Sequence, residues 1–221
     1  MANARLIQIY YKDEQKTSCY PFADLHFNPN LTVYFENSCI RELVMASKDA
    51  KISVCSWKLK EKMRYYIGKP RELTQEVLDS EYDVLSFTKN TKHHHMIDAA
   101  DHWHKGFREI LTKILQKLSI PVPREVKIPI YQNHFSARTD IYQDYVKTYL
   151  IPVMELMEKD SEINKLVMAD SNYSVLSKGN GILPDYLQKT IGIPYYPLVP
   201  FLLERLFSIY VHNHRINVTP L

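Results

Sequence analysis

Apolar positions change their spacing several times along the chain, and each change predicts a different kind of element. Short runs rich in β-branched and aromatic residues are typical of strands, whereas apolar positions three and four residues apart are typical of helices. Four strands are predicted, in the runs RLIQIYY (residues 5–11), KISVCSW (51–57) and YDVLSF (82–87) and in the alternating segment 126–137. Helices are predicted over residues 31–47, 71–80, 96–118, 141–158, 161–169 and 183–190, and from Pro197 or Pro200 to about Asn213.

Residues that start, stop or bend helices agree with this assignment. Pro121 follows the long helix 96–118, and proline disfavours helical geometry in the residue before it. Thr139 is the predicted N-cap of helix 141–158. Pro152 is expected to kink the same helix because it has no backbone N–H to donate.

Strands and helices alternate in the first half of the chain, and helices dominate the second half. This order predicts an α/β fold with a mixed, partly parallel sheet flanked by helices and a helix-rich C-terminal half. No linker rich in Gly, Ser or Pro and no internal repeat is present, so residues 1–221 are predicted to form a single domain.

The composition excludes several classes of protein. The 221 residues are 45% apolar and 24% charged, which is ordinary for a globular chain and argues against disorder. The net charge of +3 is small and dispersed, so nucleic-acid binding is not expected. With five glycines and neither GxGxxG nor GxxxxGKS/T, the chain lacks a glycine-rich phosphate loop.

Three features of the sequence indicate the compartment. No run of about 18 apolar residues is present, so a transmembrane segment is not expected, and the N-terminal MANARLIQIYYKDEQ does not resemble a signal peptide. The three cysteines are odd in number and form no CxxC, which predicts neither a disulfide framework nor a zinc ribbon. A reducing, cytoplasmic setting is therefore expected.

Five histidines lie in one 12-residue window, HHHMIDAADHWH. Imidazole nitrogens bind zinc and other divalent ions well. His95 and His102 lie two helical turns apart, with Asp98 between them, so these two histidines are weak metal-ligand candidates. A substrate-binding histidine and a set of solvated histidines at a helix entrance remain alternatives.

Isolated carboxylates are the next candidates. Asp83 stands at the head of a predicted strand, and Glu36, Asp101 and Glu204 lie on predicted helices. A carboxylate can hold Mg²⁺ or Mn²⁺ against a diphosphate, or accept the proton of an attacking hydroxyl. No Asp-x-Asp pair is present, and the alternative interpretation of Asp83 is a strand-end turn.

Basic, aromatic and amide side chains supply candidate binding residues. Trp57, Lys58 and Lys62 follow a predicted strand, where ligands bind in open α/β sheets. A ring could stack on a base or sugar, and the lysines could meet phosphates; a solvated basic helix with one packed Trp is the alternative. Asn133, within YQNHF, needs hydrogen-bond partners if it is buried.

The last predicted helix contains a charged pair within an apolar sequence. Glu204 and Arg205 stand between Leu202-Leu203 and Leu206-Phe207. Such charges must face water or be paired if buried. Arg205 could bind a phosphate through its planar guanidinium, and a plain amphipathic helix with one wet edge is the alternative.

Five segments of the chain, taken in their order, resemble those of a known family. FNPNLTVYFENSCIREL, ISVCSWKLKEK, YDVLSF, YQNHFSARTDIYQDYVKTYLIPVMELM and PFLLERLFSIYV span nearly the whole chain. Their order resembles the GT-A-like, glycosyltransferase-related proteins encoded with bacterial capsular and surface-polysaccharide genes, many of unknown function. The matching positions are Glu36, Asn37, Trp57, Lys58, Lys62, Asp83, Asn133, Glu204 and Arg205.

The resemblance implies a GT-A-like fold, a nucleotide-sugar donor and a growing glycan acceptor. In this hypothesis Asp83 lies near the diphosphate, with Mg²⁺ or Mn²⁺ as the implied cofactor. Lys58, Lys62 and Arg205 neutralise the leaving group. Glu36 or Asp101 acts as the acceptor base.

Two other functions remain open. A non-catalytic accessory protein of the same fold would bind a sugar or nucleotide without turnover, and the missing Asp-x-Asp favours it. A metal-dependent hydrolase would use the histidine window and a zinc-activated water.

Overall fold

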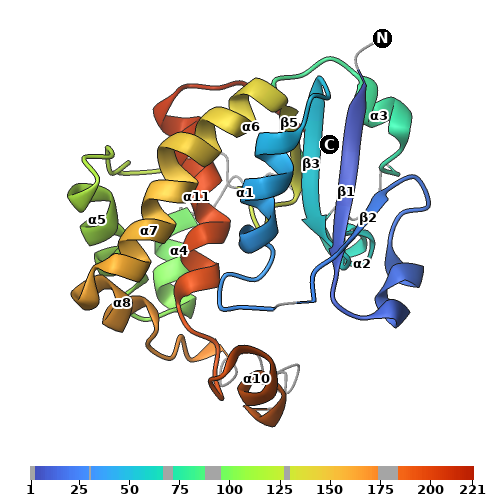
Figure 1. Ribbon diagram of the computed structural model, residues 1–221. Coiled ribbons are helices and arrows are strands. Elements are labelled where there is room, and N and C mark those ends of the chain that lie inside the picture. Colours follow the sequence, from blue (N-terminus) through green and yellow to red (C-terminus); the bar gives the residue numbers. More distant parts are fainter. Residues whose placement is uncertain (1–2, 30, 67–71, 88–95, 127–129, 174–183) are drawn as a thin grey trace.

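The computed structural model describes residues 3–29, 31–66, 72–87, 96–126, 130–173 and 184–221. Its centre is a six-stranded sheet of order β2-β1-β3-β5-β4-β6 (Figure 1). The strands are β1 (Ala4–Tyr10), β2 (Asp24–Phe27), β3 (Lys51–Ser56), β4 (Val84–Ser86), β5 (Phe135–Arg138) and β6 (Val218–Pro220). β5 is antiparallel to both β3 and β4, whereas the pairs β1–β2, β1–β3 and β4–β6 are parallel. The predicted α/β class with a mixed, partly parallel sheet is confirmed.

Each central strand is buried on both faces, because successive side chains alternate between two hydrophobic layers. Ile7 and Ile9 of β1 belong to the larger core, whereas Ala4 and Leu6 of the same strand belong to the smaller one. The buried positions of these strands include polar side chains, since Gln8 of β1 and Ser53 of β3 are both 0% exposed.

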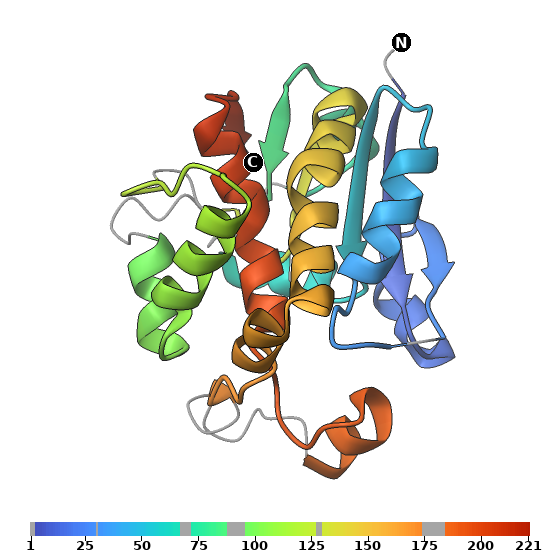
Figure 2. The same cartoon turned by 60° about the vertical axis from the view of Figure 1, so that its left-hand side comes forward.

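Helices cover both faces of the sheet (Figures 1 and 2). The larger core lies against α1 (Asn37–Ala46), α4 (Met96–Trp103), α5 (Phe107–Lys117), α6 (Thr139–Tyr145), α7 (Ile151–Lys159), α8 (Ser161–Val167) and α11 (Val199–Asn213). The smaller core lies against α2 (Leu59–Tyr66) and α3 (Gln75–Asp79). Two further segments are the 3₁₀ helix η1 (Asp13–Ser18) and α10 (Pro184–Ile191).

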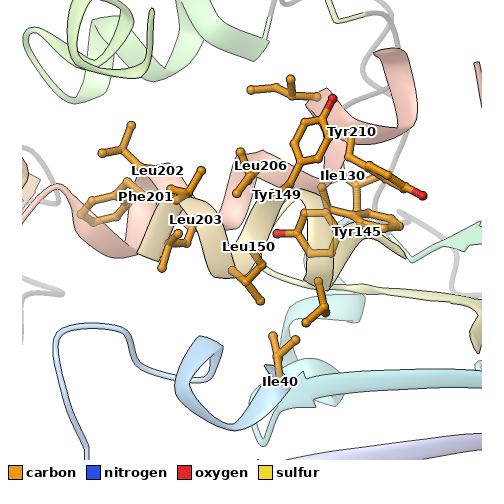
Figure 3. Packing of buried hydrophobic residues seen from close by; sticks show 14 of the residues in the cluster. Ile40, Ile130, Tyr145, Tyr149, Leu150, Phe201, Leu202, Leu203, Leu206 and Tyr210 are labelled. Atoms are coloured by element: carbon orange, nitrogen blue, oxygen red, sulfur yellow. The ribbon is translucent and has the colours of Figure 1, made fainter. Parts of the chain in front are cut away.

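The larger core is rich in aromatic rings contributed by α11, α6 and β5. Phe207 stacks on Phe135 with 3.8 Å between ring centroids and 5° between planes. Tyr145 meets Phe207 edge to face at 5.0 Å and lies 5.5 Å from Tyr210. Figure 3 shows how this group of tyrosines continues into the leucines of α11. Part of the aromatic content of the sequence is therefore a feature of its core.

Several predicted elements have different boundaries in the structure. The predicted helix 96–118 is two helices, since Gly106 adopts a left-handed φ of 83° between α4 and α5. The predicted helix 31–47 begins only at Asn37, after Phe35 with φ 49°. In the predicted strand 126–137, residues 127–129 lie outside the described residues; of the others, only the last three belong to a strand, β5, and Gln132 and Asn133 also adopt positive φ.

Helix 141–158 is present but begins at Thr139, because Arg138 and not the predicted Thr139 is the N-cap residue. The structure also shows how this helix accommodates a proline. A π-helical segment, η2 (Val146–Leu150), joins α6 to α7 immediately before Pro152. A proline removes one helical hydrogen bond, and an inserted wider turn is one way for a helix to absorb that loss. Strands β2 and β6 were not predicted.

Two findings concern the expectations on compartment. None of the described helices is long and apolar enough to cross a membrane. Cys19, Cys39 and Cys55 are all buried free thiols.

Candidate functional site

Several polar candidates gather at one edge of the sheet. The parallel strands β1, β3 and β4 end at this edge, and the antiparallel strand β5 begins there. It is the lower edge in Figure 1, next to α2. In open α/β sheets, ligands bind beyond the carboxyl ends of the parallel strands. The loops and helix starts at this edge therefore form the candidate site.

The segment leading into β5 is conformationally strained. Gln132 and Asn133 have φ values of 59° and 56°, a region that non-glycine residues rarely occupy. Asn133 is buried, and its Nδ2 donates to Oδ1 of Asn37 at 3.4 Å. Its carbonyl accepts from the thiol of Cys55 on β3 at 3.1 Å. Strained, well-anchored backbone of this kind concentrates at functional sites.

Glu36 and Asn37 lie at the start of α1. Asn37 is buried, and its Nδ2 donates to the carbonyl oxygen of Tyr34 at 3.2 Å. Glu36 is half-buried and faces Tyr11, which directly follows β1. Burial raises the pKa of the Tyr11 phenol well above its ordinary value, and the adjacent Glu36 carboxylate raises it further.

Lys62 reaches the site from α2. Its Nζ donates to Oε1 of Gln132 at 2.5 Å. Burial lowers the pKa of this amine, and the carboxylates of Glu204 and Glu36 oppose that shift. Lys62 therefore lies within electrostatic reach of both acids.

Glu204 and Arg205 come from the first turns of α11. Glu204 has 24% of its side chain exposed and Arg205 has 11%, with 4.0 Å between Oε2 and Nη1. Burial raises the pKa of Glu204, while Arg205 and then Lys62 oppose the rise. Arg205 Nη1 also donates to the carbonyl oxygen of Phe201 at 2.7 Å. The acid is thus partly accessible while its cationic neighbour is held in place.

Aromatic rings hold the guanidinium of Arg205. Its Cζ lies 5.3 Å from the ring centroid of Phe107 and 5.7 Å from that of Tyr131, both within cation–π range. These contacts place Arg205 between α5 and the segment that precedes β5.

We call the six residues Glu36, Asn37, Lys62, Asn133, Glu204 and Arg205 the carboxyl-edge cluster. They come from α2, from the beginnings of α1 and α11 and from the segment before β5, and contacts or electrostatic interactions link them. All six are sequence-predicted site residues. Trp57 and Lys58 lie beside them in the turn between β3 and α2, with Lys58 Nζ 5.2 Å from the Trp57 ring centroid.

Two buried histidines lie close to the carboxyl-edge cluster, His104 from the histidine window and His134, which was not among the predicted residues. His104 is 2% exposed and stacks on Phe201 at 3.8 Å. Burial lowers its pKa to about 4, and Arg205 contributes to the shift. His134 is completely buried, and its pKa lies well below the ordinary value because of burial and the nearby Lys62. The sequence signal that could have indicated His134 was its position next to the predicted residue Asn133.

The structure separates Asp83 and Asp101 from the carboxyl-edge cluster. Asp83 precedes β4 and therefore lies at the opposite edge of the sheet, where Arg138 Nη1 donates to its Oδ1 at 3.3 Å. Asp101 accepts a hydrogen bond from the backbone N–H of Arg108 at 2.9 Å and so caps the start of α5. Both carboxylates therefore have hydrogen-bond partners outside the carboxyl-edge cluster.

The predicted metal-ligand pair does not form a described site. His102 is exposed on α4, with its ring 5.5 Å from that of Trp103. His95 lies outside the described residues. Within the part of the chain that the structure describes, no group of three or more His, Cys, Asp or Glu side chains could hold a metal ion.

The geometry of the carboxyl-edge cluster permits proton transfer and the binding of polar ligands. It combines a carboxylate of raised pKa with two cationic groups and two amides. A raised carboxyl pKa favours general acid–base chemistry near neutral pH. No protein-family model, curated protein or solved structure matched the chain.

Proposed function

We propose that this chain is a glycosyltransferase-like protein that transfers a sugar from a nucleotide-sugar donor to a glycan acceptor in surface-polysaccharide synthesis, on a GT-A-like fold. One observation carries the proposal. Six of the residues on which the family resemblance rests come together, from distant parts of the chain, at the edge where α/β sheets bind ligands.

The site chemistry suggests a role for each charged group. Lys58, Lys62 and Arg205 would stabilise the negative charge that develops on the departing nucleoside diphosphate. Glu204 would accept the proton of the attacking acceptor hydroxyl, since it is partly exposed and burial raises its pKa. Glu36 lies close enough to Lys62 to influence its charge and would help to hold it in position.

These roles revise the hypothesis drawn from the sequence. The acceptor base, predicted to be Glu36 or Asp101, is now assigned to Glu204, and Asp83 has no part in the proposed reaction, because both aspartates have other partners. Mg²⁺ typically uses one or two protein carboxylates together with substrate phosphates. In the cluster, Glu36 and Glu204 are the carboxylates that could hold such an ion. Measuring donor binding with and without the metal tests this role.

Thermal unfolding with nucleotide-sugars tests the proposal. UDP-, GDP-, CMP- and dTDP-sugars are each added with and without Mn²⁺, and release of the nucleoside diphosphate, or of CMP from CMP-sugars, is followed in parallel. A donor at 100 times its dissociation constant stabilises the fold by about 2.7 kcal/mol. For this chain length that corresponds to a rise in melting temperature of about 5–10 °C.

A pair of lysine variants locates the binding site. Lys62→Gln is expected to reduce the donor-induced shift, whereas Lys147→Gln, at an exposed position on η2, leaves it unchanged. Stabilisation without turnover would favour the accessory, non-catalytic alternative. Absence of both stabilisation and turnover with every donor would refute the proposal.

A further inference from the structure

Aromatic side chains form a continuous wall beside Glu204. We define the aromatic wall as Phe35, His104, Tyr173, Tyr196 and Phe201. Tyr196 stacks on Phe35 at 5.9 Å and meets Tyr173 edge to face at 5.4 Å. Tyr173 lies 5.1 Å from Phe201, which in turn stacks on His104. The wall thus links the start of α1 to the start of α11.

Two tyrosines of the aromatic wall are accessible and lie close to the acid. Tyr173 is 39% exposed and Tyr196 is half-buried. Burial raises the pKa of both phenols, and the carboxylate of Glu204 adds to each shift. Both rings therefore lie within electrostatic reach of the proposed base.

The net charge of the carboxyl-edge cluster, next to the aromatic wall, indicates which kind of ligand could bind there. In the carboxyl-edge cluster, the two carboxylates of Glu36 and Glu204 balance the two cations of Lys62 and Arg205, so the cluster has no net charge when all four are ionised. A neutral polyhydroxyl ligand suits such a site, because its hydroxyls can pair with carboxylates, amines and amides alike. The further cation Lys58 lies on the turn before α2, next to Trp57.

The chemistry of an aromatic ring beside a carboxylate also fits a sugar. The face of a tyrosine ring is negative, and the C–H groups of a pyranose carry the complementary partial charge. Ligand sites commonly combine such apolar surface with a few polar groups that fix orientation. A sugar resting on Tyr173 would place its hydroxyls on the side of Glu204.

We propose that the aromatic wall is the acceptor subsite, and that it binds a neutral pyranose ring against Tyr173 and Tyr196 with a hydroxyl directed at Glu204. The donor diphosphate then binds to Lys58, Lys62 and Arg205, as in the proposed function. The assignment as acceptor subsite rests on the proposed function, whereas binding of a neutral sugar at the wall does not.

Saturation-transfer NMR on the full chain, without donor, tests the binding step. The probes are cellotetraose, mannotetraose, galactotetraose and chitotetraose, with uridine as a nucleoside probe. Wild-type protein is expected to transfer saturation to at least one tetrasaccharide. Tyr173→Ala is expected to weaken its binding at least about fivefold, and Tyr173→Phe to retain it, because the ring face is kept.

Trp103→Ala is the matched control, since Trp103 is a more exposed aromatic side chain, at 51%, whose ring lies against His102. Its affinity for the tetrasaccharides is expected to equal that of the wild type. Equal binding by wild type and Tyr173→Ala, or no binding of any tetrasaccharide, overturns the assignment. Loss of uridine rather than tetrasaccharide binding in Tyr173→Ala also overturns it, since the wall would then hold the donor base.

Transfer assays separate this inference from the proposed function. In an active enzyme, Tyr173→Ala is expected to raise the KM for acceptor with little change in kcat or in donor KM, the pattern of a lost binding contact. Tetrasaccharide binding without any turnover supports sugar binding at the aromatic wall and refutes the proposed transferase activity. Turnover with an unchanged acceptor KM in Tyr173→Ala supports the transferase and refutes the wall.

Discussion

Replacing Glu204 with glutamine removes one negative charge from the carboxyl-edge cluster while keeping the size of the side chain. In the wild type, Oε2 lies 4.0 Å from Arg205 Nη1, and 24% of the Glu204 side chain is exposed. At an effective dielectric constant of about 20, one charge pair at that distance has a Coulomb energy of about 4 kcal/mol. Desolvation of the carboxylate, which burial has already made costly, offsets much of that attraction.

The expected loss of stability for Glu204→Gln is therefore about 1–3 kcal/mol, or about 2–10 °C in melting temperature. The effect on catalysis should be much larger. Loss of a general base costs roughly 10²- to 10⁴-fold in kcat. The assay is release of nucleoside diphosphate from the donor identified by thermal shift, at a temperature where circular dichroism shows the variant folded.

Asp83→Asn is the matched control, because it makes the same chemical change at the opposite edge of the sheet. The ion pair of Asp83 with Arg138 joins side chains that are 40% and 49% exposed, and such pairs contribute about 0.2–1 kcal/mol. Turnover by Asp83→Asn should equal that of the wild type. If Glu204→Gln keeps turnover within about threefold, or if Asp83→Asn loses it, the assignment of the site to the carboxyl edge is wrong.

Three further predictions concern the fold. Burial lowers the pKa of His104 to about 4, so the unfolded chain binds a proton there first, and stability should be lost as the pH falls from about 6.5 to 4. In urea titrations, His104→Gln should abolish up to about 3 kcal/mol of that loss. If the free energy of unfolding of the variant still falls with pH as in the wild type, this account is wrong. Phe207→Ala leaves a cavity beside Phe135 and should cost about 3–5 kcal/mol in the same titrations. Burial raises the pKa of the Cys55 thiol, so it should react with a disulfide reagent only after unfolding.

The sequence predicts regular elements well where burial determines their pattern. Strands β1 and β3 were predicted to within one residue at each end, since both are short runs that contain β-branched residues and are bounded by polar residues. Helix α11 was predicted from Pro197, which precedes it, from Pro200 in its first turn and from its apolar residues. Such signals are strong because each depends only on neighbouring residues.

Boundaries that depend on single backbone conformations were not predicted. Gly106 divides one apolar stripe into two helices, and an isolated glycine is often tolerated within a helix. Gln132 and Asn133, with positive φ, form hydrogen bonds with Lys62, Cys55 and Asn37, which are distant in sequence. Local patterns contain no information about such contacts.

The same limit explains which candidate residues the structure brings together. Asp83 and Asn133 flank adjacent strands, and both were candidate site residues. Because β5 runs antiparallel to β4, a residue before β5 lies at the edge where β4 ends, whereas a residue before β4 lies at the opposite edge. The direction of one short strand therefore decides that Asn133 joins Glu204 while Asp83 pairs with Arg138, and strand direction is a property of the whole sheet.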